Sequence, residues 1–266
     1  MSFTNDTRLE RRASGRYRGD VARRWWVDRG PNGGLLAALA VAAATRELDD
    51  PDRRPCSLTL HFLVPPREGE LDVSVSVERT GERVTNCRLR MHQGERTTAL
   101  GLLSLARPID ASDAYVQARV PDVPSPGELA PLPLDAPGVP PFLRNYEFRF
   151  AAGGLPFTGA EAAETAVWVR TASRRRPDAI AVAAFADAWA RTPLVRRRAP
   201  APVPAIDLTV HFRDHDWYGR AADDDFVLAA FRSRLLAHAL FEEDGELWSP
   251  DGTLLAQSRQ LGMLLE

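Results

Sequence analysis

Apolar and polar residues alternate in several short segments of the chain, as expected for strands with one buried face. In "SLTLHFLVP", Leu58, Leu60 and Phe62 share one face, and the polar residues between them share the other. "ELDVSVSVERT" alternates in the same way, and "RVTNCRLRMHQGERTTALGLLSLA" predicts a hairpin that turns near Gly94. Upstream, "RYRGDVARRWWV" predicts a further strand. Together these segments predict an antiparallel sheet in the first half of the chain.

One long apolar run interrupts these strands. "LLAALAVAAATRELDD" is rich in Ala and Leu and is long enough for a buried helix. The "GPNGG" before it is typical of a turn. The first half therefore predicts a strand, a helix and then four strands.

The second half repeats this order. "YEFRFAAGGLPFTGAEAAETAVWVRTA" contains strand material, clearest from Thr165 to Arg170, and "PDAIAVAAFADAWARTP" predicts a helix that starts at Pro177 and stops at Pro193. "LTVHF" in "AIDLTVHFRD" then repeats "LTLHF" 150 residues later. "GELWSPDGTLLAQSRQLGMLL" predicts two strands joined by a turn at Pro250-Asp251-Gly252. "DDFVLAAFRSRLLAHALFEE" has the composition of a helix, but the repeat favours a strand.

A proline-rich stretch separates the two halves. Nine of the 21 prolines lie between Pro108 and Pro141, in a composition typical of a linker. We therefore expect an N-terminal unit over residues 1–107, a linker over residues 108–145 and a C-terminal unit over residues 146–266. Each unit would pack one long helix against an antiparallel sheet, which is an α+β fold built from two tandem units.

Composition excludes several functions. The net charge is −2, so there is no electrostatic case for nucleic-acid binding. All 34 basic residues are Arg, which excludes a lysine Schiff base. The longest apolar run is shorter than the ~20 residues of a membrane span, and no signal core begins the chain, so we expect a cytoplasmic protein without membrane insertion. We expect Cys56 and Cys87 to be buried free thiols, and the Arg-rich first 24 residues to form a solvated arm.

Asp207 is the first candidate for chemistry. It precedes the second "LTVHF", whereas Ser57 precedes the first copy. A carboxylate between apolar strand residues is unusual, because burying an unpaired charge is costly. It could be a general base that activates water. It could equally be a solvated or capping residue at the start of a strand.

Two further residues could share a site with Asp207. Gln260, in "AQSRQLG", could orient a water through its amide, although a surface strand position is the simpler interpretation. Ser233, in "FRSRLL", could add a hydroxyl, but no G-x-S-x-G motif marks it as a nucleophile. The histidine spacing gives no reason to expect a metal site.

Gly33 and Gly34 precede the first predicted helix. A helix N-terminus presents free N–H groups and a positive dipole end, which could stabilise an oxyanion. A simple turn before a helix would need the same residues. Arginines at 174–176 and 196–198 flank the second helix and could bind phosphates, although solvated charge is the simpler interpretation.

Four phrases in order, "GPNGGLLAALA", "SLTLHFLVP", "AIDLTVHF" and "GELWSPDGTLLAQSRQ", resemble the acyl-CoA thioesterase superfamily with a double-hotdog fold. The chain is most similar to its bacterial thioesterase II (TesB-like) and thioesterase-like proteins. The resemblance implies hydrolysis of acyl-CoA to free acid and CoA in lipid metabolism, without a metal or redox cofactor. It also implies a homodimer or a larger homo-oligomer.

The same resemblance implies roles for particular residues. Asp207 matches the family's water-activating Asp, and Gln260 matches the Gln of its final strand. Ser233 or a neighbour would supply the hydroxyl, because "FRSRLL" departs from the Thr-containing pattern of the family. Gly33 and Gly34 match the glycines before the first helix.

Two other functions remain open. The first is a non-catalytic protein that binds acyl-CoA or an acyl chain on the same fold. The second is a hotdog hydratase or dehydratase, which is disfavoured because "RDHDWYG" departs from the D-x-N-P-x-H pattern of such enzymes.

Overall fold

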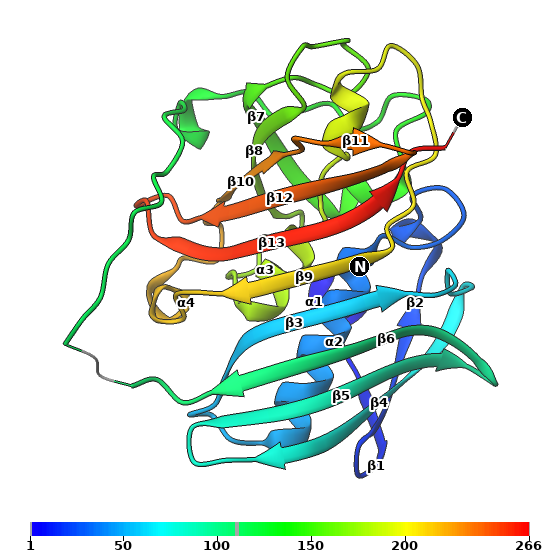
Figure 1. Ribbon diagram of the computed structural model, residues 1–266, viewed down its shortest axis with the longest axis vertical. Coiled ribbons are helices and arrows are strands. Elements are labelled where there is room, and N and C mark those ends of the chain that lie inside the picture. Colours follow the sequence, from blue (N-terminus) through cyan, green and yellow to red (C-terminus); the bar gives the residue numbers. More distant parts are fainter. Residues whose placement is uncertain (1, 110–111, 266) are drawn as a thin grey trace.

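Strands make up most of the regular structure in the computed structural model, which describes residues 2–109 and 112–265. Within these residues, 13 strands form one antiparallel sheet in the order β1-β2-β4-β5-β6-β3-β9-β13-β12-β10-β8-β7, with β11 paired to β12 (Figure 1). The strands are β1 (Glu10–Ala13), β2 (Arg16–Val21), β3 (Arg54–Phe62), β4 (Gly69–Thr80), β5 (Val84–Gln93), β6 (Arg96–Ala106), β7 (Tyr146–Gly153), β8 (Glu164–Thr171), β9 (Asp207–Phe212), β10 (Val227–Arg232), β11 (Leu236–Ala237), β12 (Leu240–Trp248) and β13 (Leu254–Met263).

Two helices cover the inner face of this sheet. Helix α2 (Gly33–Leu48) packs on β3, β4, β5 and β6, and it contacts α3 (Ala179–Phe185). Buried residues of α3 belong to the same core as residues of the second-half strands. The shorter elements are α1 (Phe3–Asp6), α4 (Asp216–Arg220) and the 3-10 turns η1 (Arg23–Trp25), η2 (Pro126–Glu128), η3 (Pro141–Asn145) and η4 (Thr192–Val195). A helix wrapped by an antiparallel sheet thus occurs twice, which confirms the α+β double-hotdog prediction.

The two copies of the repeated phrase pair with each other at the middle of the sheet. Strands β3 and β9 are antiparallel neighbours, and Thr59 lies opposite Thr209. Their hydroxyl oxygens are 3.0 Å apart. This register places Asp207 opposite His61. The duplicated strands therefore form the seam between the halves, with approximate two-fold symmetry about the two threonines.

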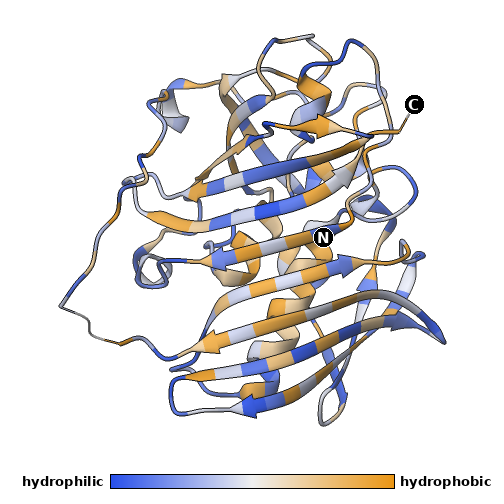
Figure 2. Ribbon diagram, viewed as in Figure 1, coloured by the Kyte–Doolittle hydropathy of each residue, from blue (hydrophilic) through white to orange (hydrophobic). Residues whose placement is uncertain are grey.

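Helix α2 is apolar from its start to Ala44, where the sheet and α3 enclose it (Figure 2), and its last turn carries the exposed Thr45 and Arg46. The side chain of Asn32 caps it by accepting a hydrogen bond from the N–H of Leu35 at 3.1 Å. At its other end, Asp49 adopts the left-handed conformation with φ 48°. None of the helices in the described residues is long and apolar enough to cross a membrane.

Most of the strands predicted from the sequence are present, but one predicted helix and one predicted strand end earlier than expected. The hairpin at Gly94 and the turn at Gly252 are present, and the segment that could have been a helix forms β10 and β11. However, the helix predicted from Pro177 to Pro193 ends at Phe185. The chain leaves the helix where Asp187 turns its carboxylate toward the start of α2. Similarly, the strand predicted in "RYRGDVARRWWV" stops at Val21 and gives way to η1.

The prediction of a solvated N-terminal arm is wrong. Strands β1 and β2 form the edge of the sheet, and β2 pairs with β4. Phe3, Leu9, Tyr17 and Val21 are buried in the core. The arginines between them lie on the solvent side, so the charge that suggested an arm belongs to one face of an edge strand.

The segment between the halves covers the outer face of the second-half strands. Ala166, Trp168, Phe226, Leu228 and Trp248 are buried there, and linker residues such as Val123 and Leu129 pack against them. The indole N–H of Trp168 donates to the carbonyl of Pro124 at 2.9 Å. The linker is therefore part of the folded structure.

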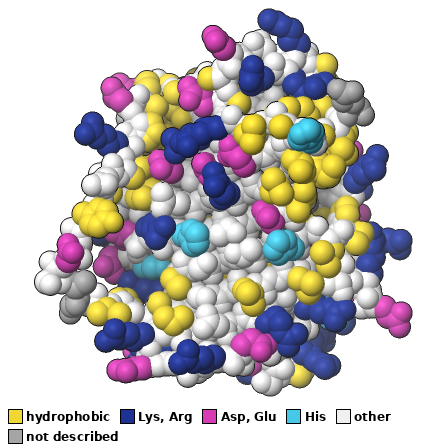
Figure 3. Space-filling view, viewed as in Figure 1, with side chains coloured by type: hydrophobic (Ala, Val, Ile, Leu, Met, Phe, Trp, Pro, Cys, Tyr) yellow, Lys and Arg dark blue, Asp and Glu magenta, His cyan; other side chains and the backbone are white. Residues whose placement is uncertain are grey.

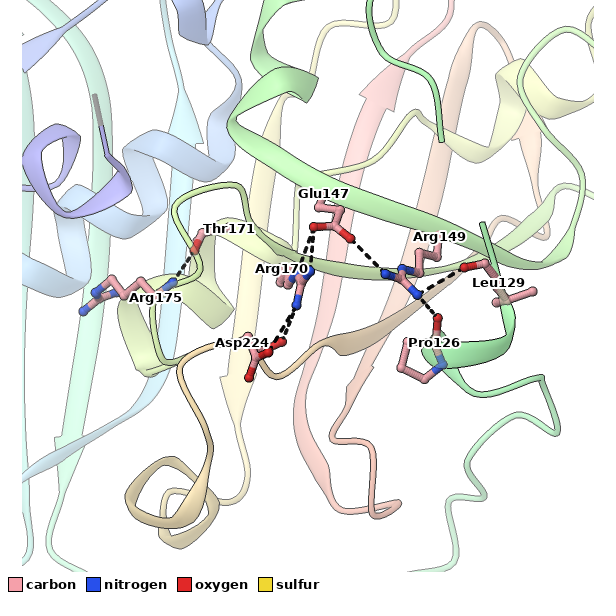
Figure 4. A network of polar contacts seen from close by, with 8 residues as sticks. All are labelled: Pro126, Leu129, Glu147, Arg149, Arg170, Thr171, Arg175 and Asp224. Carbon is pink, nitrogen blue, oxygen red and sulfur yellow. Dashed lines mark hydrogen bonds and ion pairs between the residues drawn. The ribbon is translucent and has the colours of Figure 1, made fainter. Parts of the chain in front are cut away.

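A network of arginines holds one turn of this linker (Figure 4). Arg149 donates to the carbonyls of Pro126 and, at 3.1 Å, Leu129. Arg170 donates to Glu147 through Nε at 3.0 Å and Nη2 at 2.7 Å. These charged hydrogen bonds attach η2 to β7 and β8.

The outer face of the first-half strands has no such cover within the described part of the chain. Leu102 on β6 is 62% exposed, and Leu100 beside it is also exposed. Further exposed hydrophobic side chains gather around β11 and the nearby C-terminal segment (Figure 3); they include Leu235, Leu236, Leu240 and Leu265. The predicted homo-oligomer remains a prediction.

Candidate active site

Asp207 begins β9 at the end of the seam that lies near the start of α2. Its Oδ1 accepts a hydrogen bond from the N–H of Leu261 on β13 at 2.9 Å. Leu208 and Val210 are fully buried, so Asp207, which alternates with them, belongs to the other face of the strand. The side chain is half-buried. Its structural role is to tie the start of β9 to the end of β13.

Gln260 lies immediately before Leu261 but faces the core. It is only 2% exposed, so the predicted alternative of a surface position is wrong. Its Nε2 donates to Oε1 of Glu243 at 2.8 Å. Its Oε1 is buried and has no hydrogen-bond partner within the described residues. A buried amide oxygen without a partner is uncommon, and it leaves an acceptor available inside the protein.

Glu243, on β12, belongs to a buried ionic network that was not predicted from the sequence. Its Oε2 accepts the N–H of Thr192 at 2.5 Å, and its Oε1 lies 3.4 Å from Nη1 of Arg191. Arg191 also forms an ion pair with Asp187. Burial raises the pKa of Glu243, and the charge of Arg191 offsets only part of this effect. Both carboxylates are nearly inaccessible to solvent.

Asp187 carries this network to the start of α2. Its Oδ2 accepts the N–H of Gly34 at 2.9 Å and lies 3.2 Å from Nδ2 of Asn32. A continuous chain of polar contacts therefore runs from the N-terminus of α2 through Asp187, Arg191 and Glu243 to Gln260. It joins the two halves of the molecule on the inner side of the sheet.

The glycines at the start of α2 are explained first by packing. A Cβ on Gly34 would lie 2.5 Å from the carbonyl oxygen of Ala184, and a Cβ on Gly33 would lie 2.7 Å from Cζ of Phe62. The N–H of Gly34 is already bonded to Asp187. If this terminus binds an oxyanion, the half-buried Gly33 is the better placed of the two glycines.

Ser233 lies just beyond the end of β10 and is half-exposed. Its hydroxyl is 3.4 Å from the carbonyl oxygen of Leu235, and its N–H donates to Ala163. The register of β10 on β12 pairs Arg232 with Asp244, which places Ser233 next to Glu243 in that order. Among the described residues, no hydrogen bond joins Ser233 or Gln260 directly to Asp207. The structure therefore brings Gln260 and Asp207 to neighbouring positions on paired strands, with their side chains on opposite faces, and places Ser233 two strands away from Gln260.

An aromatic cluster lies beside this network. Ring centroids are separated by 5.8 Å for Trp25 and Tyr146, 5.9 Å for Tyr146 and Phe185, and 4.9 Å for Phe148 and Trp189. Burial and the charge of Asp187 raise the pKa of Tyr146 well above its ordinary value. All five rings are buried, so the cluster forms part of the core next to the start of α2.

A signal for the missed residues was present in the sequence. Asp187 is the only charged residue in "AIAVAAFADAWA", and a lone carboxylate in an apolar helix needs a partner. Arg191 follows it at the spacing of one helical turn. Glu243 is harder to find, because it stands in the charged run "FEEDGE", where alternation alone does not say which carboxylate is inside.

The flanking arginines have mixed roles. Arg175 pairs with Asp178 at the start of α3, and Arg176 lies 3.5 Å from Asp223. These contacts account for part of the first cluster without a phosphate.

Comparison with family models decides the family. The acyl-CoA thioesterase N-terminal domain matches residues 22–106, and the acyl-CoA thioesterase C-terminal domain matches residues 118–264. The chain belongs to the acyl-CoA thioesterase family. This confirms the resemblance inferred from the sequence, and the family is one of thioester hydrolases.

Solved structures agree with this fold. A hot dog fold protein of unknown function from Alicyclobacillus acidocaldarius is 26% identical, with a TM-score of 0.89 and coverage of 99% of this chain and 98% of that one. The acyl-CoA thioesterase II TesB2 from Mycobacterium marinum is 19% identical, with a TM-score of 0.77 and coverage of 98% and 97%. At that identity, the second likeness concerns the fold alone.

A curated relative matches only in part. The thioesterase-like protein TwmA from Talaromyces wortmannii is 33% identical over 112 residues, which is 41% of this chain and 30% of that protein. The chain thus matches less than a third of the length of this relative.

Proposed function

We propose that this member of the acyl-CoA thioesterase family hydrolyses acyl-CoA, with Asp207 as general base and Gln260 holding the attacking water. One observation carries the proposal. The carboxylate of Asp207 is held by the N–H of Leu261, which directly follows Gln260, and the Oε1 of Gln260 is a buried acceptor without a partner among the described residues. Alternation along β9 and β13 assigns the two side chains to opposite faces of the sheet, so in this proposal the Asp207 carboxylate, at the first residue of β9, reaches past the end of the strand to a water held by Gln260.

The reaction follows from these positions. Asp207 takes a proton from water as the water oxygen attacks the thioester carbonyl carbon. The tetrahedral oxyanion then collapses, the C–S bond breaks, and the CoA thiolate takes up the proton that Asp207 accepted, which regenerates the carboxylate. The products are a free acid and CoA, and no electron acceptor or donor is needed.

The start of α2 supplies the stabilising charge in this proposal. The N–H of Gly34 is committed to Asp187, so the N–H of Gly33 is the donor proposed for the oxyanion. Ser233 is proposed as an accessory hydroxyl near the outer end of the site.

A thiol-release screen tests this function. Purified protein is incubated with short, long, branched and aromatic acyl-CoAs, and free CoA is measured. The variant Asp207→Asn keeps an oxygen acceptor for the N–H of Leu261, so we expect it to fold but to lose about 100- to 10,000-fold in rate. The control is Asp214→Asn, which changes a carboxylate that only caps a turn at Trp217. Equal activity of Asp207→Asn and wild type on every hydrolysed substrate would remove Asp207 from the mechanism.

A non-catalytic acyl-CoA binder is the second candidate, and one observation favours it. The Asp207 carboxylate and the N–H of Gly34 each already have a structural partner. Calorimetric binding of acyl-CoA without thiol release over hours would support the binder and exclude the hydrolase.

A further inference from the structure

A chain of buried polar contacts joins Gln260 to the start of α2. Hydrolysis with Asp207 as general base does not by itself need the buried Glu243, Arg191 and Asp187 of this chain. Two carboxylates and one guanidinium lie inside the core, where an ion pair is often no more stabilising than apolar residues of the same size. Two of their contacts lead to parts of the molecule that the proposed function uses. At one end Glu243 binds the amide of Gln260, and at the other Asp187 binds the start of α2.

We propose that Glu243 is a positioning residue for Gln260, and that Arg191 and Asp187 lock it in register with the N-terminus of α2. This inference rests on the proposed function. It adds Glu243, Arg191 and Asp187, which were not among the site residues predicted from the sequence. Oε1 of Glu243 faces two N–H donors, Nε2 of Gln260 and Nη1 of Arg191, so Glu243 is the acceptor at this end of the amide. Glu243 therefore fixes which end of the amide points toward it, and this leaves Oε1 of Gln260 free for the water.

Apart from Gln260, two residues hold Glu243. The N–H of Thr192 donates to Oε2 at 2.5 Å, and Arg191 lies 3.4 Å from Oε1. Arg191 is fixed in turn by its ion pair with Asp187. Because Asp187 also accepts the N–H of Gly34 at 2.9 Å, the amide that holds the water and the helix end that faces the oxyanion belong to one rigid unit. Correct placement of both groups at once is worth far more than either alone, since a 1 Å displacement can cost about 100-fold in rate.

Glu243→Gln tests the proposal most directly. It keeps the size of the side chain but lets either end of the Gln260 amide face it. We expect kcat to fall about 10- to 100-fold with KM nearly unchanged. Glu246→Gln is the matched control, because it makes the same change three residues later on β12, on the outer face, and should leave both constants unchanged.

A double-mutant cycle separates positioning from general stability. If Glu243 acts through Gln260, then Glu243→Gln should cost nothing further in kcat once Gln260→Ala is present. Losses that simply add in the double variant would overturn the proposal, as would full kcat in Glu243→Gln. Arg191→Lys is the milder companion variant should Glu243→Gln fail to fold. It keeps the charge but not the two-sided contact, and it should also lower kcat; unchanged kcat in that variant would count against the proposal.

One readout does not depend on turnover. In wild-type protein, the side-chain amide protons of Gln260 should exchange slowly with solvent and give a single resolved NMR signal pair, assigned by its loss in Gln260→Ala. In Glu243→Gln they should exchange faster or split into two sets. Unchanged signals would refute the positioning role even if the protein hydrolyses nothing. Conversely, normal Glu243→Gln kinetics with an inactive Asp207→Asn would refute the positioning role alone and leave the hydrolase intact.

Discussion

Helices α2 and α3 begin in different ways. Asn32 caps α2, but the N–H of Gly34 is bonded to Asp187, which comes from the other half of the chain. At α3, Asp178 accepts the N–H of Ala181 at 2.9 Å and pairs with Arg175, so that its whole cap lies within one short segment. The start of α2 therefore depends on the second half, whereas the start of α3 is self-contained.

Strands β3 and β9, one from each half, also differ in their polar contacts. Ser57 on β3 and Asp207 on β9 stand at equivalent places in the repeated phrase, yet only Asp207 ties its strand to a neighbour through a carboxylate. The seam formed by β3 and β9 thus has two equivalent ends. The buried polar network lies near the end that carries Asp207 and not near the end that carries Ser57. In the proposed function, only one copy of the repeated phrase carries the chemistry.

The largest expected effect tests this asymmetry in activity. Asp207→Asn should lose about 100- to 10,000-fold in thioester hydrolysis because the base is removed. Ser57→Ala, the equivalent change in the other half, should stay within about two-fold of wild type. Steady-state rates of CoA release measure both. A comparable loss in Ser57→Ala would show that both ends of the seam contribute.

The close approach of the two helices predicts the largest effect on stability. Gly34→Ala places a Cβ 2.5 Å from the backbone oxygen of Ala184, which cannot move without shifting α3. We expect a loss of about 1–3 kcal/mol in the free energy of unfolding. Gly219→Ala, in α4, has open space around the added methyl and should be neutral or slightly stabilising. Urea unfolding measures both variants, and equal stabilities would contradict the contact.

Local pattern and tertiary pairing explain what could be predicted from the sequence. Alternation located β3 and β9 because each strand has one buried face. It could not show that the two strands pair with each other, since period-two patterns record burial and not partners. The length of α3 was overestimated for a related reason. "AIAVAAFADAWA" is helical by composition, but Asp187 bonds to α2, and that tertiary contact ends the helix.

The site was predictable only where a residue stands out from its neighbours. Asp207 stands out because its repeat partner is Ser57. Glu243 does not, because Glu242 and Asp244 flank it and only the fold decides that the middle one is buried. The alternative of a surface position for Gln260 was wrong for the same reason, since the sequence of one strand does not show that its partner Glu243 is buried.

Glu47 and Glu243 should make the free energy of unfolding respond to pH in opposite ways. Glu47 is half-buried in the first half of the chain, and Glu243 is fully buried in the second half. Burial raises the pKa of Glu47, but hydrogen bonds from Tyr17 and Ser14 and the charge of Arg11 outweigh it, so its pKa lies below the ordinary value. The pKa of Glu243 lies above the ordinary value, because its burial outweighs the attraction of Arg191. The folded state therefore favours the ionised form of Glu47 and the protonated form of Glu243.

The signs follow from proton linkage. Glu47 contributes stability above its unfolded pKa and loses it as the pH falls through its lowered folded pKa. Glu243 contributes fully below its unfolded pKa and loses it as the pH rises through its raised folded pKa. Chemical unfolding at a series of pH values should show Glu47→Gln flattening the acid side of the stability curve. Glu243→Gln should flatten the other side, and the reverse pattern would contradict these environments.

The smallest effect compares the covered and open outer faces of the sheet. Trp168→Phe removes the indole N–H that donates to Pro124 at 2.9 Å while keeping most of the apolar contact beneath the linker. We expect a loss of about 0.5–1.5 kcal/mol and faster proteolysis of the linker. Leu102→Thr, on the open face of β6, should change stability by less than about 0.5 kcal/mol, because the side chain is 62% exposed. If Leu102→Thr is instead the more destabilising change, then something covers that face in solution. The first-half strands would then have a cover that corresponds to the linker on the second half.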